Sequence, residues 1–124
     1  MAKLIMLVVG GGLGTLMRYL FSGIIYQFAG TRFPYGTLAV NLLGCFLIGF
    51  LIAISEEKFL LSVNARVFLI VGVLGGFTTF STFMLETANL IRDGETLAAL
   101  GNVLISVIIG FFFLIVGGTY WATR

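Results

Sequence analysis

Long apolar runs dominate this chain, separated by short polar stretches. A helix that crosses the hydrocarbon core of a bilayer needs about 20 mostly apolar residues. Four segments meet this requirement, with approximate limits at 4–26, 36–54, 66–91 and 96–121. The stretches between them are short and carry the turn-forming and charged residues, including Pro34, the only proline. The pattern predicts an all-α membrane protein of four transmembrane helices, forming a single domain over residues 1–124.

The overall composition agrees with a location in the bilayer. Hydrophobic residues make up 60% of the 124 positions and charged residues only 10%, which is too few to cover the surface of a soluble domain. The first apolar run continues through Tyr26 without a convincing small-residue cleavage site. We therefore expect an uncleaved, multi-pass protein of the plasma membrane.

Several functional classes are excluded by what the sequence lacks. With no histidine, the Ser/His triad, the usual proton shuttle and His-ligated metals are unavailable, so we expect no enzyme. The single cysteine, Cys45, builds neither a disulfide framework nor a thiolate metal site within one chain. The basic residues are scattered singly, so we expect no nucleic-acid partner.

The distribution of positive charge gives little preference for one orientation in the membrane. With four spans, one side carries Lys3, Lys58, Arg66 and Arg124, and the other carries Arg32 and Arg92, with Arg18 near enough to join them. So small a bias permits insertion in both directions and pairing with an inverted copy, as a dual-topology antiparallel homodimer. A fixed topology with a weak signal explains the charges equally well.

The third apolar segment contains the most unusual run, residues 72–83, in which two adjacent glycines precede four hydroxyl residues. Adjacent glycines weaken a helix, and hydroxyl side chains compete for its backbone groups. We predict a third helix broken near residues 75–79, with free carbonyls suited to a cation such as Na⁺. The alternative is an unbroken helix whose glycines serve packing and whose hydroxyls bond back to carbonyls.

Phe80 and Phe83 are three positions apart and share a face if the chain is helical after the break. Phenylalanine stripes usually serve lipid contact or packing. However, the positive edge of an aromatic ring attracts anions, and Thr79, Ser81 and Thr82 beside these rings donate hydrogen bonds. Neutral donors and ring edges bind a small anion weakly enough to release it, as conduction requires.

Other polar side chains lie within the remaining spans. Asn41 lies in the second, while Asn102 and Ser106 are four residues apart in the fourth. Each alone is typical of a hydrogen bond between helices. Together with the hydroxyl run they predict a polar track through an otherwise apolar protein.

Two ionisable residues in the spans are functional candidates. Arg18 is expected roughly 21 Å along the first helix from Leu4, near the far interface, where it attracts anions to a vestibule or anchors the helix among headgroups. Glu86 follows the break and is a candidate gate, hydrogen-bond partner or interfacial cap.

The residues at this point resemble the Fluc (CrcB) family of fluoride channels of microbial membranes. Gly36-Thr37-Leu38-Ala39-Val40-Asn41-Leu42-Leu43-Gly44 looks like the second-helix pattern of that family, and residues 75–83 with Glu86 look like its third-helix signature. The order, spacing and four-helix length agree over essentially the whole chain.

The resemblance implies a fluoride-selective channel for passive export of cytoplasmic fluoride, in the plasma (inner) membrane of a microbe. It implies an antiparallel homodimer with two pores and a structural Na⁺ at its centre, held by the backbone carbonyls of Gly75 and Thr78. Arg18 matches the arginine of the anion entrance. Phe80, Phe83 and Asn41 match the pore residues of the family, and Ser106, with Asn102 one turn before it, continues the polar track.

Two other functions are alternatives to the channel. A proton-coupled small multidrug exporter has the same length, but it needs a carboxylate in the first helix, and residues 4–26 contain no Asp or Glu. A structural subunit of a larger membrane complex leaves the broken helix and the polar track unexplained.

Overall fold

The computed structural model describes residues 1–56 and 61–122, and the side chains of residues up to 119. Four helical spans of this part are long and apolar enough to cross a membrane. The first two are continuous helices, α1 (Ala2–Ala29) and α2 (Tyr35–Glu56). The predicted limits 4–26 and 36–54 are therefore confirmed to within three residues at either end.

The third span covers Val63–Arg92 and is interrupted. It begins with α3 (Val63–Arg66), where the Ser62 side chain accepts a hydrogen bond from the Ala65 N–H. The span continues as the π-helix η1 (Val67–Leu74) and α4 (Gly75–Phe77), and resumes as α5 (Ser81–Arg92). Thr78 between them has an extended backbone, with φ −91° and ψ 159°.

The predicted break is confirmed, but its position needs a correction. Gly75 and Gly76 are helical, and the unwound residues are 78–80. The reason is that the glycines serve helix packing. A Cβ on Gly76 would lie 2.5 Å from the Gly11 carbonyl oxygen and 3.1 Å from the Thr15 nitrogen, both on α1. The alternative assigned the glycines to packing, and that part of it is correct.

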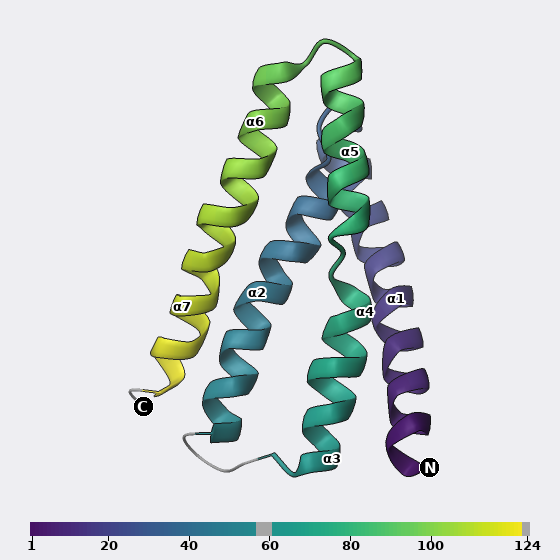
Figure 1. Ribbon diagram of the computed structural model, residues 1–124, viewed down its shortest axis with the longest axis vertical. Helices are drawn as coiled ribbons and strands as arrows, with labels where there is room; N and C mark the ends of the chain where they lie inside the picture. Colours follow the sequence, from purple (N-terminus) through teal and green to yellow (C-terminus); the bar gives the residue numbers. More distant parts are fainter. Residues whose placement is uncertain (57–60, 123–124) are drawn as a thin grey trace.

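The fourth span consists of α6 (Thr96–Leu104), the π-helix η2 (Ile105–Ile109) and α7 (Gly110–Ala122). A tight turn joins it to α5. Gly94 has φ 81°, and the Glu95 N–H donates to the Leu90 carbonyl at 2.8 Å, which is the Schellman pattern that ends a helix. Figure 1 shows the consequence: the fourth span returns beside α2, and α7 ends at the same end of the molecule at which α1 begins.

Close backbone contacts hold the spans together at glycines. Gly14 of α1 faces the Val73 carbonyl of η1, and Gly49 of α2 faces the Leu114 carbonyl of α7, each too closely to admit a Cβ. Small residues allow such approaches in membranes, where dispersion contacts rather than hydrophobic burial drive association. The buried residues of α1 are both glycines, Gly10 and Gly14.

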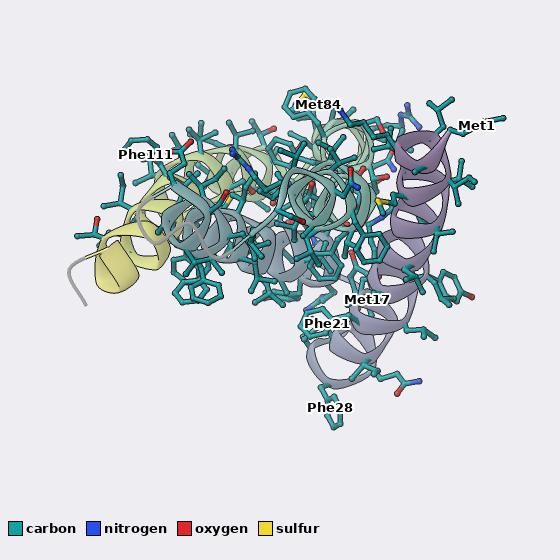
Figure 2. All side chains as sticks on the ribbon, turned by 90° about the horizontal axis from the view of Figure 1, so that it is seen from below. Met1, Met17, Phe21, Phe28, Met84 and Phe111 are labelled. Atoms are coloured by element: carbon teal, nitrogen blue, oxygen red, sulfur yellow. The ribbon has the colours of Figure 1, made fainter. Side chains whose placement is uncertain are left out.

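The apolar surface is extensive, as expected for a molecule solvated by lipid. The buried cluster is small, consisting of Val40, Leu74 and Phe77 with partly buried neighbours. Figure 2 shows side chains projecting outward around the spans, with Phe28 and Phe111 pointing away from the rest of the molecule. An all-helical arrangement of four potential spans is thus established for the described residues.

Candidate functional site

Asn41 of α2 holds the unwound residues of the third span in place. Its Nδ2 donates to the Thr79 carbonyl at 2.9 Å, and its Oδ1 accepts from the Thr79 N–H at 2.8 Å. Both backbone groups of Thr79 are therefore satisfied by one amide side chain. Backbone that leaves a helix at membrane depth must find such partners, because lipid offers none.

This arrangement frees the carbonyl groups of Gly75 and Thr78 from their usual helical donors. In a continuous helix, the Thr79 N–H would bond to Gly75 and the Thr82 N–H to Thr78. Here the Thr79 N–H donates to Asn41, and the Thr82 N–H donates to the Thr79 hydroxyl at 3.2 Å. Gly75 is exposed, and both residues line a groove of about 360 Å³ between α2 and the third span.

The donor set of Gly75 and Thr78 fits a cation. Carbonyl oxygens suit hard cations, and these two lie at the carboxyl end of a helical segment, where the helix dipole is negative. The carbonyls of Gly75 and Thr78, which the family resemblance assigns to Na⁺, are thus both without their usual helical N–H donors. One chain supplies too few of them to complete a coordination shell.

Arg18 contacts the third span rather than the end of its own helix. Its Nε donates to the Gly76 carbonyl at 3.2 Å, directly before the break. Its own helix, α1, continues beyond Arg18 to Ala29. A guanidinium beside the last carbonyls of a helical segment is in the favourable place for a cation.

Phe80 and Phe83 are neighbours, as their spacing predicts. Their ring centroids are 5.8 Å apart and the rings are tilted by 58°, so an edge of one is turned toward the other. Phe83 is only 6% exposed, whereas Phe80 is 73% exposed. Phe80 therefore presents its ring outside the single chain, while Phe83 belongs to its interior.

Two polar groups of the fourth span, the Asn102 amide and the Ser106 hydroxyl, are buried. Asn102 is 1% exposed, and its Nδ2 donates to the Thr87 hydroxyl of α5 at 3.0 Å. Thr87 in turn donates to the Phe83 carbonyl at 2.7 Å. One turn later, the Ser106 hydroxyl is buried with no hydrogen-bond partner in the described part of the chain. A buried hydroxyl without a partner is uncommon and has capacity for a ligand.

Glu86 lies between two hydroxyl groups from other helices. Tyr26 of α1 donates to Oε2 at 2.9 Å, and Thr37 of α2 donates to Oε1 at 2.5 Å. These two hydrogen bonds join three spans at one carboxyl group. These contacts make Glu86 a hydrogen-bond partner of two other helices.

A polar cavity of about 270 Å³, which we call the vestibule cavity, connects several of these residues. It is lined by Thr15, Arg18, Tyr19, Ser22, Tyr26, Thr37, Thr79, Thr82 and Glu86. A second cavity of about 340 Å³, the mouth cavity, lies toward the end of the bundle and shares Tyr26 and Glu86 with the first. Its other lining residues are Thr31, Arg32, Pro34, Asn89, Leu90 and Asp93.

The structure brings together only part of the predicted hydroxyl set. Thr79 and Thr82 line the vestibule cavity, whereas Ser81 is exposed and does not. Tyr26 and Thr37 also line this cavity, and the sequence did not predict them as site residues. Glu86 itself could have indicated them, because a carboxyl group within a span requires hydrogen-bond donors. Hydroxyl residues near the ends of neighbouring helices are candidates for such donors.

These features define a class: a four-span membrane protein whose interrupted third helix borders polar cavities. Residues 5–118 match the family described as CrcB-like protein, Camphor Resistance (CrcB). The chain therefore belongs to the CrcB family.

Curated relatives carry the name fluoride-specific ion channel FluC. The protein of Citrifermentans bemidjiense is 49% identical over 87% of both chains. That of Geotalea daltonii is 48% identical over 94% of both chains, and that of Aquifex aeolicus is 44% identical over 87% of both. These names describe ion channels rather than enzymes. The resemblance drawn from the sequence is confirmed, as is the expectation of a multi-pass membrane protein in a microbe.

Proposed function

We propose that this protein is a fluoride-selective channel that passively exports fluoride from the cytoplasm. The observation that carries the proposal is the interrupted third span, whose unwound turn Asn41 fixes beside the vestibule cavity. The relatives named fluoride-specific ion channels supply the identity of the ion. A small anion needs neutral donors with little opposing charge, which is what Thr79 and Thr82 offer.

The proposed path enters at the mouth cavity, passes Glu86 into the vestibule cavity, and continues along the pore residues. Arg18 and Arg32 attract the anion on the way. Beyond the break, the ring edges of Phe80 and Phe83 receive it, and Asn41 contributes the amide donor that Thr79 does not use. The unpaired Ser106 hydroxyl accommodates it further along, with Asn102 ordering the neighbouring turn.

The active assembly in this proposal is an antiparallel, dual-topology homodimer with two pores. Phe80 is largely exposed, and the groove at the break is open on the side of Gly75. Both features suit a face that a second copy covers, so that each pore takes residues from both chains. The nearly even distribution of basic residues between the two ends permits the inverted pairing.

A structural Na⁺ at the centre of this dimer is part of the proposal. The ion would supply a fixed positive charge between the two chains. The carbonyls of Gly75 and Thr78 from each copy would hold it, and their diverted helical donors support this assignment. Asn41 thus serves the cation site as well, because it removes the Thr79 N–H from Gly75.

A small multidrug exporter is the disfavoured alternative. Such a transporter needs a carboxylate in the first helix to exchange protons, and α1 contains none. The carboxylate at the vestibule, Glu86, lies on α5 and is occupied by Tyr26 and Thr37.

The proposal is tested by reconstituting the purified protein in liposomes loaded with potassium fluoride or potassium chloride. Efflux is started with valinomycin and followed with ion-selective electrodes. We expect fluoride to leave rapidly and chloride to stay at the rate of protein-free liposomes. Equal release of both ions, or of neither, would refute the proposed function.

A further inference from the structure

Arg18 forms a contact that attraction of anions does not require. The last turn of α4 has carbonyls whose donors are lost at the break, because no helical N–H follows at the right position. The Arg18 Nε donates to one of them, the Gly76 carbonyl, at 3.2 Å. The side chain therefore does for α4 what a cap does for an ordinary helix end.

The geometry of this contact is set by the backbones and leaves little freedom. A Cβ on Gly76 would lie 2.5 Å from the Gly11 carbonyl oxygen and 3.1 Å from the Thr15 nitrogen. The last turn of α4 is therefore held directly against α1 beside Thr15, which is less than one helical turn from Arg18. The guanidinium reaches Gly76 because glycine allows the two helices to approach so closely.

A guanidinium can serve two partners at once, unlike an ammonium group. Its five N–H donors are arranged in a planar fork, and the bond to Gly76 uses Nε. Both terminal amino groups remain available to the vestibule cavity, which Arg18 lines together with Thr79 and Thr82. A lysine has one compact ammonium group, which can donate to the Gly76 carbonyl or face the cavity but cannot do both.

We propose that Arg18 is a positioning residue of the ion pathway, which caps the carboxyl end of α4 through Nε and offers its terminal amino groups to the anion in the vestibule cavity. The negative end of a helix beside that cavity would repel an anion, and the cap removes this repulsion. The inference rests on the proposed function, and it assigns to Arg18 a role beyond its charge.

Measuring current as a function of fluoride concentration in planar bilayers distinguishes the capping role of Arg18 from attraction of the anion by charge alone. If Arg18 acts by charge alone, Arg18→Lys conducts like the wild type, and Arg18→Gln recovers at saturating fluoride. The capping role predicts that the maximal current of both variants falls about tenfold and is not restored by saturation. Lys3→Gln removes a positive charge from the start of α1, away from the cavity, and should conduct like the wild type. An Arg18→Lys variant with unchanged maximal current would overturn the inference.

A spectroscopic readout tests the cap without any transport. Glycine labelled with ¹³C at the carbonyl and phenylalanine labelled with ¹⁵N mark three peptide bonds, which follow Gly49, Gly76 and Gly110. The Gly76 signal is assigned as the one that Phe77→Leu removes. In Arg18→Gln and Arg18→Lys we expect this carbonyl shift to move while the other two stay, which also shows that the fold is intact. An unmoved Gly76 shift would refute the cap even if the protein conducts fluoride, whereas a wild type that moves no fluoride would refute the proposed function alone.

Discussion

At the scale of single residues, the Asn41 amide is the side chain that holds the unwound turn of the third span in place. It satisfies both the N–H and the carbonyl of Thr79 with two hydrogen bonds, at 2.8 and 2.9 Å. An amide can do this because it presents one donor and one acceptor side by side. No other side chain of similar size and charge offers the same pair, apart from glutamine.

We predict that Asn41→Asp reduces fluoride flux at least about tenfold, since a carboxylate oxygen replaces the donor that faces the Thr79 carbonyl. The measurement is fluoride efflux from liposomes, with size-exclusion chromatography to verify assembly. Asn64→Asp is the matched control, because Asn64 is exposed in α3 and lies outside the site. Full flux in Asn41→Asp would remove Asn41 from the pathway.

The second prediction for a single residue concerns the ring of Phe80. Because Phe80 is 73% exposed in the chain, Phe80→Ile removes an aromatic edge without emptying a core. We expect fluoride flux to fall about tenfold or more while dimers persist on size exclusion. Phe111→Ile, at a ring that points away from the molecule in Figure 2, should leave flux unchanged. If both variants conduct alike, the ring of Phe80 has no part in conduction.

At the scale of elements, glycines determine how the spans approach one another. Gly14 of α1 meets the backbone of η1 at Val73, whereas Gly12, two residues earlier, has nothing near its missing Cβ. The same substitution is therefore disruptive at one position and neutral at the other.

We predict that Gly14→Ala lowers stability by about 1–3 kcal/mol, as overpacking does, and that Gly12→Ala is neutral or slightly stabilising. Thermal unfolding in detergent, followed by loss of the size-exclusion peak, measures both variants. Equal midpoints for the two variants would mean that α1 does not pack on η1 as described.

The elements also show how far the sequence predicts this fold. The limits of the four spans follow from hydropathy because a bilayer imposes a minimum apolar length. The break was predicted near residues 75–79 from the two glycines and the hydroxyl run, and residues 78–80 are unwound. It begins after the glycines because these pack against α1, while Asn41 stabilises Thr79. Long-range partners of this kind leave no local signal in the chain.

For the candidate site, residue types were predictable but their partners were not. Arg18 and Glu86 are conspicuous as charges within spans, but the Gly76 carbonyl and the Tyr26 and Thr37 hydroxyls that they bond are distant in sequence. Packing of three separate helices decides these pairs. The roles of Phe80, Phe83 and Ser106 in conduction remain predictions for experiment.

At the scale of the whole molecule, a single chain leaves open the groove between α2 and the third span, and its Phe80 ring is exposed. We predict a dimer of oppositely oriented chains. A cysteine added at Lys3 in a Cys45→Ala background should be labelled by a membrane-impermeant maleimide from outside spheroplasts in about half of the chains, with the rest labelled after lysis. Labelling of all chains from one side only would exclude dual topology.

Fluoride selectivity is tested most directly by the zero-current potential of the reconstituted protein in a planar bilayer, with a tenfold gradient of potassium fluoride and equal chloride on both sides. A passive fluoride-selective channel predicts a potential close to the fluoride equilibrium value, about 59 mV for a tenfold gradient of a singly charged ion. A potential near zero, or one of the sign set by potassium, would contradict the claim that this protein conducts fluoride selectively.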